Sequence, residues 1–428
     1  MERQARGSTH EPVHLAVVYR AADSAPGRLT HRPIASPPGA LVHSLSDPWS
    51  PVPLNSGTTL RNRFVLAPMT TDSSHPDGSV TEAELNYLSR RAATGFGAVI
   101  TSCAYVHPAG RAWRGIGASD ESHLDSLRAV ARAARGDGGV AILQIYDGGR
   151  IALPELIGPD ALRGPSAVPS ARPNAHTPRA LDDDEIDNLL AAFGQAAAYG
   201  MEAGFDGIEI HGANHYLVHQ FFSPRANRRT DRWGGSLDAR MRFPLAVART
   251  VRETVGDAAT VGFRITPFES EAGGYTLDDA SALADRLAAH GMDYVHISMD
   301  NFRRNSPQPE DRDWTKSRQQ VESRNPIEAI AEAVDGRSAV VASGGIRTLD
   351  DARTALTAGA DLIAVGRAAL IDPEWVDKIQ AGAHSQIRTH MPPSAADIES
   401  TLTIPPPMVR YLLSRPGWIP RVEQDSRS

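Results

Sequence analysis

Short apolar runs alternate with helical patterns along most of the chain. The runs are rich in Val, Ile, Phe and Ala, which is typical of parallel strands that are buried on both faces. From about Leu54 onward this alternation occurs eight times. The predicted strands are Phe64–Ala67, Ala98–Ser102, Val140–Gln144, Gly207–Ile210, Thr260–Ile265, Tyr294–Ser298, Ala339–Ser343 and Leu362–Val365.

Amphipathic helices are predicted between these strands. In Thr81–Thr94, for example, Leu85 and Leu88 fall on one face, and Asp278–His290 has a similar pattern. Repeated strand–helix units without consecutive strands predict an α/β fold, a (β/α)8 TIM barrel with a single domain and long loops. Functional residues should lie on the loops after the carboxyl ends of the strands. Glycines at or near the C′ position close most of the helices: Gly95, Gly136, Gly204, Gly256, Gly291, Gly336 and Gly359.

The chain divides into three parts by pattern. Residues 1–46 show no period of a strand or helix and contain a Pro-rich stretch, so we expect a disordered extension. Residues 47–385 form the predicted barrel, and residues 386–428 form a tail that packs on the barrel or on a neighbouring subunit. Two connections, Asp147–Leu181 and Asp300–Arg324, are too long for simple turns and should stand over the barrel mouth.

Composition excludes several classes of protein. The 428 residues include a single cysteine, Cys103, so an internal disulfide, a four-thiolate zinc site and a cysteine-ligated iron–sulfur cluster are all excluded. No apolar run approaches the roughly 18–20 residues that span a bilayer. We therefore expect a cytoplasmic protein without a membrane partner.

Charge gives little support for a nucleic-acid partner. Lys316 and Lys378 are the only lysines among 44 basic residues, but the formal net charge is −7 and the arginines are scattered among 51 acidic residues. No basic stripe forms, so the arginine usage is ascribed to genome base composition and no nucleic-acid partner is expected. A small-molecule substrate is expected instead, and a homo-oligomer remains open.

Two glycine corners predict a phosphate site. Gly344 and Gly345 follow the seventh predicted strand, and Gly366 and Arg367 follow the eighth. Barrels commonly hold a phosphate at this position, because glycines let backbone N–H groups approach its oxygens and an arginine adds a bidentate donor. Either corner alone would indicate only a tight turn, but two adjacent corners with an arginine predict a phosphate site.

Polar side chains also cluster after the fourth strand. His211 and Asn214 can both donate hydrogen bonds to one carbonyl oxygen, and Tyr216 can serve as a proton donor. His211, His215 and His219 share a spacing of four residues that could form a metal-binding face. No neighbouring carboxylate or cysteine completes such a set, so we expect no metal site.

These residues belong to motifs that resemble the Old Yellow Enzyme family of FMN-dependent ene-reductases, in the NADH:flavin oxidoreductase group. The resemblance extends from about Leu54 to Gln380. Its most specific motif is NRRTDRWGGSLDARMRF, which begins at Asn227. The other motifs are RNRFVLAPMT, which begins at Arg61, and AGFDGIEIHGAN, which begins at Ala203.

The resemblance implies a role for each candidate residue. Pro68, Met69 and Thr70 would line the flavin, with the Thr70 hydroxyl near its C4 carbonyl. Gln144 would bond the pyrimidine edge, and Arg264 would place positive charge near N1 and the C2 carbonyl. The remaining assignments are Gly344, Gly345, Gly366 and Arg367 for the phosphate, His211 and Asn214 for the substrate carbonyl, Tyr216 for the proton, and Cys103 as a small side chain packed over the flavin.

The chain departs from the family pattern in several places. Asp147 replaces a histidine near the substrate pocket, and Thr70 stands where one subgroup has cysteine. Asn214 makes a His/Asn donor pair where that subgroup often has His/His. Arg303 and Arg304, on the long loop after the sixth strand, could hold the 2′-phosphate of NADPH, although a solvated loop is the simpler interpretation.

The resemblance implies an FMN-dependent oxidoreductase with a ping-pong mechanism. NADH or NADPH would reduce the flavin, and hydride would then pass to the activated C=C bond of an α,β-unsaturated carbonyl compound. Two alternatives remain open from the residues alone. One is a phosphate-binding barrel isomerase or lyase without flavin, and the other is an FMN-binding protein without turnover.

Overall fold

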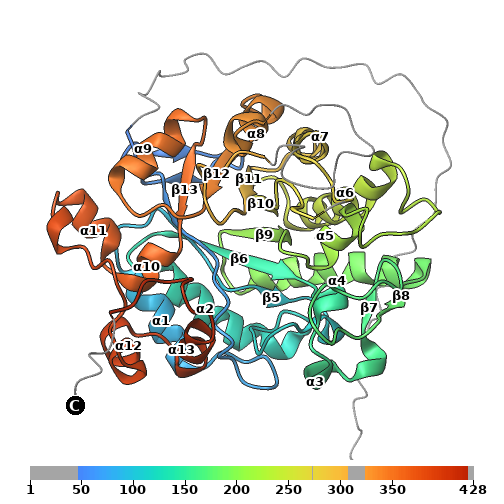
Figure 1. Cartoon of the computed structure of the whole chain (residues 1–428), viewed down its shortest axis with the longest axis horizontal. Coiled ribbons are helices and arrows are strands. Elements are labelled where there is room, and N and C mark those ends of the chain that lie inside the picture. Colours follow the sequence, from blue (N-terminus) through green and yellow to red (C-terminus); the bar gives the residue numbers. More distant parts are fainter. Residues whose placement is uncertain (1–46, 272, 307–322, 423–428) are drawn as a thin grey trace, which may run out of the picture. The chain divides into compact units, whose positions relative to one another are not determined.

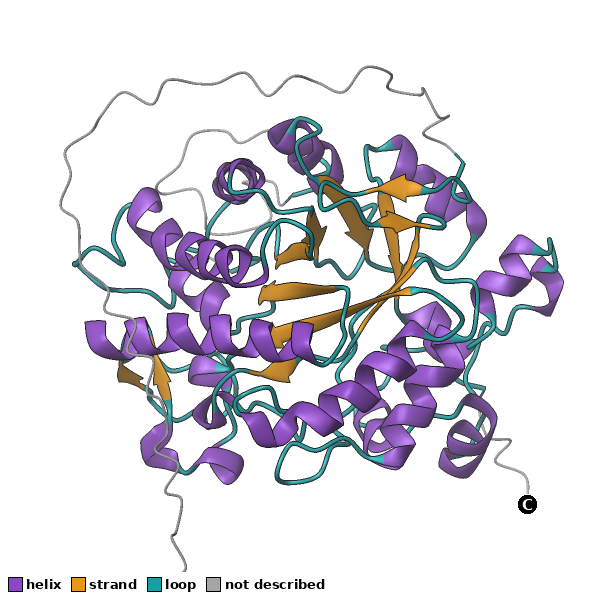
Figure 2. Ribbon diagram, turned by 180° about the vertical axis from the view of Figure 1, so that it is seen from behind, coloured by secondary structure: helices purple, strands orange, loops and turns teal. Residues whose placement is uncertain are grey.

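The structure is a computed structural model that describes residues 47–271, 273–306 and 323–422. The predicted extension over residues 1–46 lies outside the described residues, as does most of the long connection after the sixth predicted strand. Strands occupy the centre of the described part, and helices surround them (Figure 1). The view from behind shows the same arrangement (Figure 2).

Parallel strands close into a barrel, which confirms the predicted (β/α)8 fold. In the described part of the chain the barrel strands are β3 (Phe64–Leu66), β4 (Ala98–Ile100), β6 (Val140–Tyr146), β9 (Gly207–Gly212), β10 (Thr260–Ile265), β11 (Tyr294–Ile297), β12 (Ala339–Ser343) and β13 (Leu362–Val365). They pair in the order β4-β3-β13-β12-β11-β10-β9-β6, and a pairing of β4 with β6 closes the ring.

Two strands run further than the apolar pattern predicts. β6 continues to Tyr146 because its last two residues pair with β5 (Ala104–Tyr105). β9 continues to Gly212 because its ladder with β10 extends to the end of both strands and sets His211 opposite Arg264. His211 therefore belongs to the sheet and not to the loop after it.

Helices alternate with the strands and cover their outer face (Figures 1 and 2). Side-chain caps fix where they begin. Asp182 and Glu185 form a capping box on α4 (Asp183–Glu202), and Thr276 and Asp279 form one on α7 (Leu277–Ala289). Within the described residues, no helix has both the length and the apolar character of a bilayer span. The helices of the barrel are α1 (Glu82–Ala92), α2 (Leu124–Arg135), α4 (Asp183–Glu202), α6 (Leu237–Val255), α7 (Leu277–Ala289), α8 (Pro326–Val334), α9 (Leu349–Thr357), α10 (Arg367–Ile371) and α11 (Trp375–Gln380).

Shorter elements complete the described chain. β1 (Val52–Pro53) and β2 (Thr59–Leu60) form an antiparallel pair whose Val52 and Leu60 pack with the apolar side chains inside the barrel. The long connection after β6 contains its own short elements, and residues 165–178 between β7 and β8 form no helix or strand. The remaining elements are β1 (Val52–Pro53), β2 (Thr59–Leu60), β7 (Arg163–Gly164), β8 (Arg179–Ala180), α3 (Pro154–Ile157), α5 (Leu217–Phe222), α12 (Ala395–Leu402), α13 (Pro406–Leu413) and the 3-10 turns Pro108–Gly110, Glu121–His123, Gly149–Ile151, Pro159–Ala161 and His384–Gln386.

Apolar side chains form two layers. Val65, Ile142 and Val341 belong to a cluster inside the barrel, and a larger cluster that includes Phe193 and Phe243 joins strands to the surrounding helices. Both faces of each barrel strand are therefore buried, as the continuous apolar runs predict.

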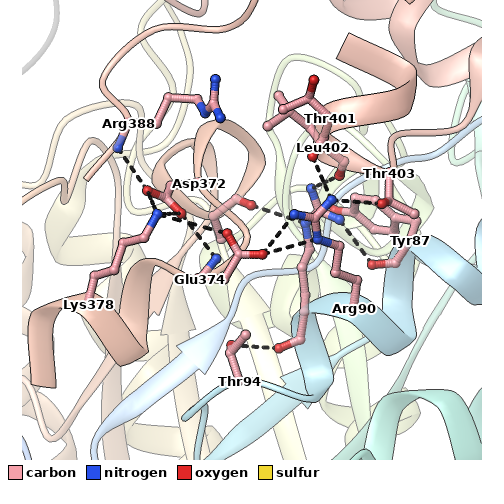
Figure 3. Close-up of polar contacts among 12 residues, drawn as sticks. Tyr87, Arg90, Thr94, Asp372, Glu374, Lys378, Arg388, Thr401, Leu402 and Thr403 are labelled. Carbon is pink, nitrogen blue, oxygen red and sulfur yellow. Dashed lines mark hydrogen bonds and ion pairs between the residues drawn. The ribbon is translucent and has the colours of Figure 1, made fainter. Parts of the chain in front are cut away.

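Two arginines at the end of α1 hold the C-terminal segment against the barrel. Arg90 forms an ion pair with Glu374 at 2.8 Å and donates to the carbonyl oxygen of Thr401 at 2.6 Å (Figure 3). Arg91 is fully buried and donates to the carbonyl oxygen of Leu402 at 3.1 Å. These bonds fix the end of α12, and α13 follows directly.

Asp372 ties the start of the same segment to α11. Its carboxylate lies 2.7 Å from the ammonium group of Lys378 and accepts the backbone N–H of Arg388 at 2.8 Å (Figure 3). Residues 386–422 are therefore anchored to this chain's own barrel at both of these points.

Candidate active site

A cavity of about 280 Å³ is lined by residues at or just beyond the carboxyl ends of the barrel strands. It is the place where function is expected in this fold. The structure brings every candidate residue from the sequence to its wall: Pro68, Met69, Thr70, Cys103, Gln144, His211, Asn214, Tyr216, Arg264, Gly344, Gly345, Gly366 and Arg367.

His211 presents a neutral imidazole to this cavity. Its Nδ1 accepts the backbone N–H of Ala213 at 3.3 Å, so the proton of a neutral ring is on Nε2. Burial lowers the pKa of His211 well below its usual range, and the nearby positive charge of Arg264 lowers it further. The ring can therefore donate one hydrogen bond without carrying charge.

Asn214 is held by residues that directly follow two neighbouring strands, β10 and β11. Its backbone N–H donates to Thr266 Oγ1 at 3.1 Å, and its side-chain Oδ1 accepts from Ser298 Oγ at 3.0 Å. The backbone has a φ of +56°, which asparagine tolerates better than most residues. Because Ser298 engages the amide oxygen, the amide nitrogen is the group that can donate into the cavity.

Tyr216 lies at the N-cap of α5 with its ring buried. Its hydroxyl oxygen accepts the indole N–H of Trp113 at 2.6 Å. Its ring meets the ring of His211 edge to face, with centroids 4.6 Å apart. Burial raises the pKa of Tyr216 well above its usual value, so the hydroxyl keeps its proton. Because the hydroxyl oxygen accepts from Trp113, the hydroxyl proton points away from Trp113 and can be donated to another group.

A buried polar network lies beneath one side of the cavity. Gln144 Nε2 donates to one oxygen of Glu209 at 2.6 Å, and His296 Nδ1 donates to the other at 2.9 Å. Burial would raise the pKa of Glu209, but His296, Arg264 and the Gln144 donor outweigh it, so the pKa is lowered. With its nitrogen engaged by Glu209, Gln144 offers its carbonyl oxygen as an acceptor.

Arg264 places a positive charge at the cavity wall beside Gln144 and Glu209. Its Nε is buried and has no hydrogen-bond partner among the described residues, and burial lowers its pKa. An orphaned buried donor is costly unless a ligand satisfies it. Together with the Gln144 acceptor, it fits the polar edge of a heterocycle that carries both N–H and C=O groups.

Glycines and an arginine after β12 and β13 form a part of the cavity wall that we call the phosphate cradle: Gly344, Gly345, Gly366 and Arg367. Gly344 has a φ of +116°, and a Cβ there would come within 2.9 Å of the Met299 carbonyl oxygen. Arg367 Nη2 donates to the Asp300 carbonyl oxygen at 2.6 Å, which orients the guanidinium. Gly344, Gly345 and Gly366 are half-buried and line the cavity without side chains, so their backbone could approach a phosphate there.

The wall from β3 and β4 is small and mostly apolar. Met69 and Thr70 are half-buried, and Pro68 and Cys103 are buried. Burial raises the pKa of the Cys103 thiol to about 12. The thiol therefore stays protonated and packs as a small apolar group.

The C-terminal segment supplies a wall that the sequence analysis did not assign. Tyr411 packs edge to face against Trp113 with ring centroids 5.3 Å apart. The guanidinium of Arg415 lies 4.4 Å from the Tyr411 ring centroid. The amphipathic pattern of residues 406–413 was the available signal, but it could not reveal which surface the helix covers. The cavity residues from this segment are Met408, Tyr411, Leu412, Arg415 and Trp418.

Three other residues singled out in the sequence have partners elsewhere. Asp147 is buried and pairs with Arg163 at 2.8 Å, and it is not among the residues that line the cavity. Arg303 pairs with Asp351 at 2.8 Å, and Arg304 lies 3.8 Å from an oxygen of Asp300.

Sequence comparison identifies several relatives. A family model described as the NADH:flavin oxidoreductase / NADH oxidase family matches residues 49–386. The "Probable NADH-dependent flavin oxidoreductase YqiG" of Bacillus subtilis (strain 168) is 37% identical over 377 residues, covering 87% of this chain and 97% of the relative. The NADH:fumarate oxidoreductase of Klebsiella pneumoniae (strain 342) is 38% identical over 378 residues, but the match covers 85% of this chain and 38% of the relative.

Solved structures show the same architecture. Morphinone reductase matches with a TM-score of 0.66 and 28% sequence identity, covering 83% of this chain and 94% of that protein.

Proposed function

The chain belongs to the NADH:flavin oxidoreductase / NADH oxidase family, and we propose that it reduces the activated C=C bond of α,β-unsaturated carbonyl compounds. Family membership makes it a flavin oxidoreductase with FMN as cofactor and NADH or NADPH as the reductant. It also sets aside the two alternatives left open by the residues alone, an isomerase or lyase without flavin and a flavin-binding protein without turnover. The acceptor, the mechanism and the residue roles are our proposal.

The residues of the cavity fit FMN. The phosphate cradle would hold the phosphate through its exposed backbone, with Arg367 beside it. Gln144 would accept from an N–H of the ring's pyrimidine edge, and Arg264 would donate to that edge with its otherwise orphaned nitrogen. When bound, FMN takes hydride from the reduced nicotinamide and delivers it to the acceptor.

His211 and Asn214 would bind the carbonyl oxygen of the acceptor. Each has one donor directed by a bond on its other atom, Nδ1 of His211 to Ala213 and Oδ1 of Asn214 to Ser298. Two donors on one carbonyl oxygen withdraw electron density from the conjugated C=C bond and stabilise the oxyanion that develops.

Tyr216 would donate the proton to the α-carbon of the acceptor. The observation that carries the proposal is the location of its protonated hydroxyl in the same cavity as the two carbonyl donors. Trp113 holds that hydroxyl by donating to its oxygen. General acid catalysis of this kind contributes about 10²–10⁴-fold.

Relatives support a C=C acceptor. The Klebsiella pneumoniae relative is named for fumarate, a compound with a C=C bond conjugated to carboxyl groups. Because this chain spans 38% of that relative's length, the acceptor of the relative enters here only as support for the proposal.

Anaerobic half-reactions test the proposal. The FMN-loaded protein should lose its visible flavin absorbance on addition of NADH or NADPH, and 2-cyclohexen-1-one or fumarate should restore it. Cyclohexanone, which lacks the C=C bond, is the matched control and should not reoxidise the enzyme. Reoxidation by quinones or oxygen without any reoxidation by conjugated alkenes would contradict the proposed acceptor class.

A separate steady-state experiment identifies the preferred nicotinamide. Arg303 is paired with Asp351, so its guanidinium is already engaged in this structure. We therefore propose NADH as the better donor, and a comparison of kcat/KM for NADH and NADPH checks it. A clear preference for NADPH that is lost in Arg303→Ala would instead support the binding of the NADPH 2′-phosphate by Arg303.

A further inference from the structure

A second polar cluster lies outside the residues that line the cavity. His215 precedes α5, His219 lies within α5, and Glu269 lies on the loop after β10. One possible ligand atom from each residue lies within 4.8 Å of the other two. None of the three lines the cavity described above.

Two of the three ligand atoms are already spaced as in a metal site. His219 Nε2 and Glu269 Oε1 are 3.2 Å apart. Ligand atoms on adjacent corners of a tetrahedral zinc site are about 3.3 Å apart, because the bonds to Zn²⁺ are about 2.0–2.1 Å long. The pair therefore needs little movement to share a cation.

Glu269 is oriented by groups behind it. Ser223 Oγ donates to both carboxylate oxygens, at 2.8 and 2.7 Å, and the backbone N–H of Tyr275 donates to Oε2 at 3.3 Å. Such supporting hydrogen bonds commonly fix a metal-ligating carboxylate. The Glu269 side chain is 0% exposed, so its geometry is set before any ligand arrives.

His219 offers Nε2 as its ligand atom. Its side chain is 1% exposed, and its Nδ1 is buried without a hydrogen-bond partner among the described residues. A cation at Nε2 places the ring proton on Nδ1, and the ion would replace the hydrogen bond between Nε2 and Glu269 by bonds to both residues.

His215 completes the set and opens it to solvent. The residue is exposed, and its ring centroid lies 4.8 Å from that of His219. An exposed third ligand can rotate toward an incoming ion, and water can fill the remaining position. Two imidazoles and one carboxylate are a donor set that Zn²⁺ favours.

We propose that His215, His219 and Glu269 bind one divalent transition cation of the Zn²⁺ class. The ion would join the loop after β9 to the loop after β10. Asn214 and Tyr216 flank His215 in the chain, so the bound ion would stiffen the loop that carries both. This is the opposite of the sequence-based expectation, in which no carboxylate completed the histidine set.

Titration calorimetry with ZnCl₂ on untagged, FMN-loaded protein, after treatment with a chelator, tests the site. We expect saturable binding of one Zn²⁺ per chain. His215→Asn removes the imidazole but suits the local φ of +65°, and it should weaken binding at least about tenfold. His290→Asn, at an exposed histidine that ends α7, is the matched control and should bind as the parent does.

A thermal unfolding series provides a second readout. Zn²⁺ should raise the Tm of the parent and of His290→Asn, because a ligand that binds the folded state stabilises it, and it should raise the Tm of His215→Asn less at the same Zn²⁺ concentration. Two results would overturn the site. One is the absence of saturable binding up to about 1 mM Zn²⁺, and the other is equal binding by His215→Asn and the parent, which would leave His219 and Glu269 as a hydrogen-bonded pair only.

Discussion

Trp113 donates its indole N–H to the hydroxyl oxygen of Tyr216 across 2.6 Å. The two residues come from different parts of the chain, the loop after β5 and the N-cap of α5. Because the Tyr216 oxygen already accepts from Trp113, the hydroxyl's own proton stays available to donate to another group. In the proposed reaction Trp113 is therefore a positioning residue, and Tyr216 is the residue that touches the substrate.

Tyr216→Phe should slow the acceptor half-reaction by about 10²–10³-fold, because it removes the general acid. Reduction by NADH should change little, since that step needs no proton from Tyr216. Stopped-flow measurement of the two half-reactions separates these effects. Unchanged enone turnover in Tyr216→Phe would show that water supplies the proton.

Trp113→Phe should slow the acceptor half-reaction less, by about fivefold, since a typical hydrogen bond contributes about 1 kcal/mol. The loss should disappear in the Tyr216→Phe background if Trp113 acts through the Tyr216 hydroxyl. Equal losses in both backgrounds would instead indicate that Trp113 only shapes the cavity.

The pH profile of the acceptor half-reaction should lack a histidine titration. Burial holds the pKa of His211 well below its usual range. The ring is therefore neutral throughout the region around pH 6.5, where an unperturbed histidine titrates. His211→Ala should lower the rate by about 10²–10³-fold. An inflection near pH 6.5 that vanishes in this variant would contradict the neutral assignment.

Arg264→Met should lower the reduction potential of the bound flavin. Positive charge at this wall favours the anionic reduced form, and a hydrogen bond to a charged group contributes about 1.5–3 kcal/mol. For a two-electron couple this corresponds to a shift of about 30–60 mV. Potentiometric titration measures it, with Arg304→Met as a control at a cation that does not line the cavity. An unchanged reduction potential in Arg264→Met would show that Arg264 does not stabilise the reduced flavin.

Cys103 should resist alkylation in the folded enzyme. Its pKa is raised to about 12 by burial, so almost no thiolate exists at pH 8. A thiol-reactive dye should label the native protein slowly and the urea-unfolded protein rapidly, because the thiol then regains a pKa of about 8.5. Rapid labelling of the native state would show that the thiol is reactive.

Arg91→Met should lower the free energy of unfolding by roughly 3 kcal/mol or more, because buried carbonyl oxygens at Tyr87, Ala369 and Leu402 would lose their donor. Burial lowers the pKa of Arg91 to about 10, so the guanidinium is still charged at neutral pH. Urea unfolding at pH 7 measures the loss.

Arg128→Met is a comparison for this prediction, since Arg128 forms its ion pairs on the exposed surface of α2. The loss there should stay within about 1 kcal/mol. A similarly small loss in Arg91→Met would show that the C-terminal segment is held mainly by its apolar contacts.

The eight barrel strands and the candidate residues at their ends were predictable from the sequence alone. Each strand is encoded locally by a short apolar run, and parallel strands in a closed barrel present their carboxyl ends at one mouth. For that reason the phosphate cradle and His211 could be assigned to one site from the barrel pattern, whereas Gln144 and Arg264 were assigned to it through the family resemblance. Only the strand ends differed. β6 and β9 continue because their ladders with β5 and β10 continue, and β3, β4 and β11 end one or two residues before the predicted ends.

Only the tertiary structure decided which atoms of the site are already engaged and what covers the mouth. Ser298 fixes the amide of Asn214 across 84 residues, and Arg91 reaches Leu402 across 311 residues to hold the segment that carries Tyr411 to the cavity. Glu269 joins His219 from 50 residues away. No local pattern encodes these partners, because closing the barrel is what brings loops from distant units into hydrogen-bonding distance.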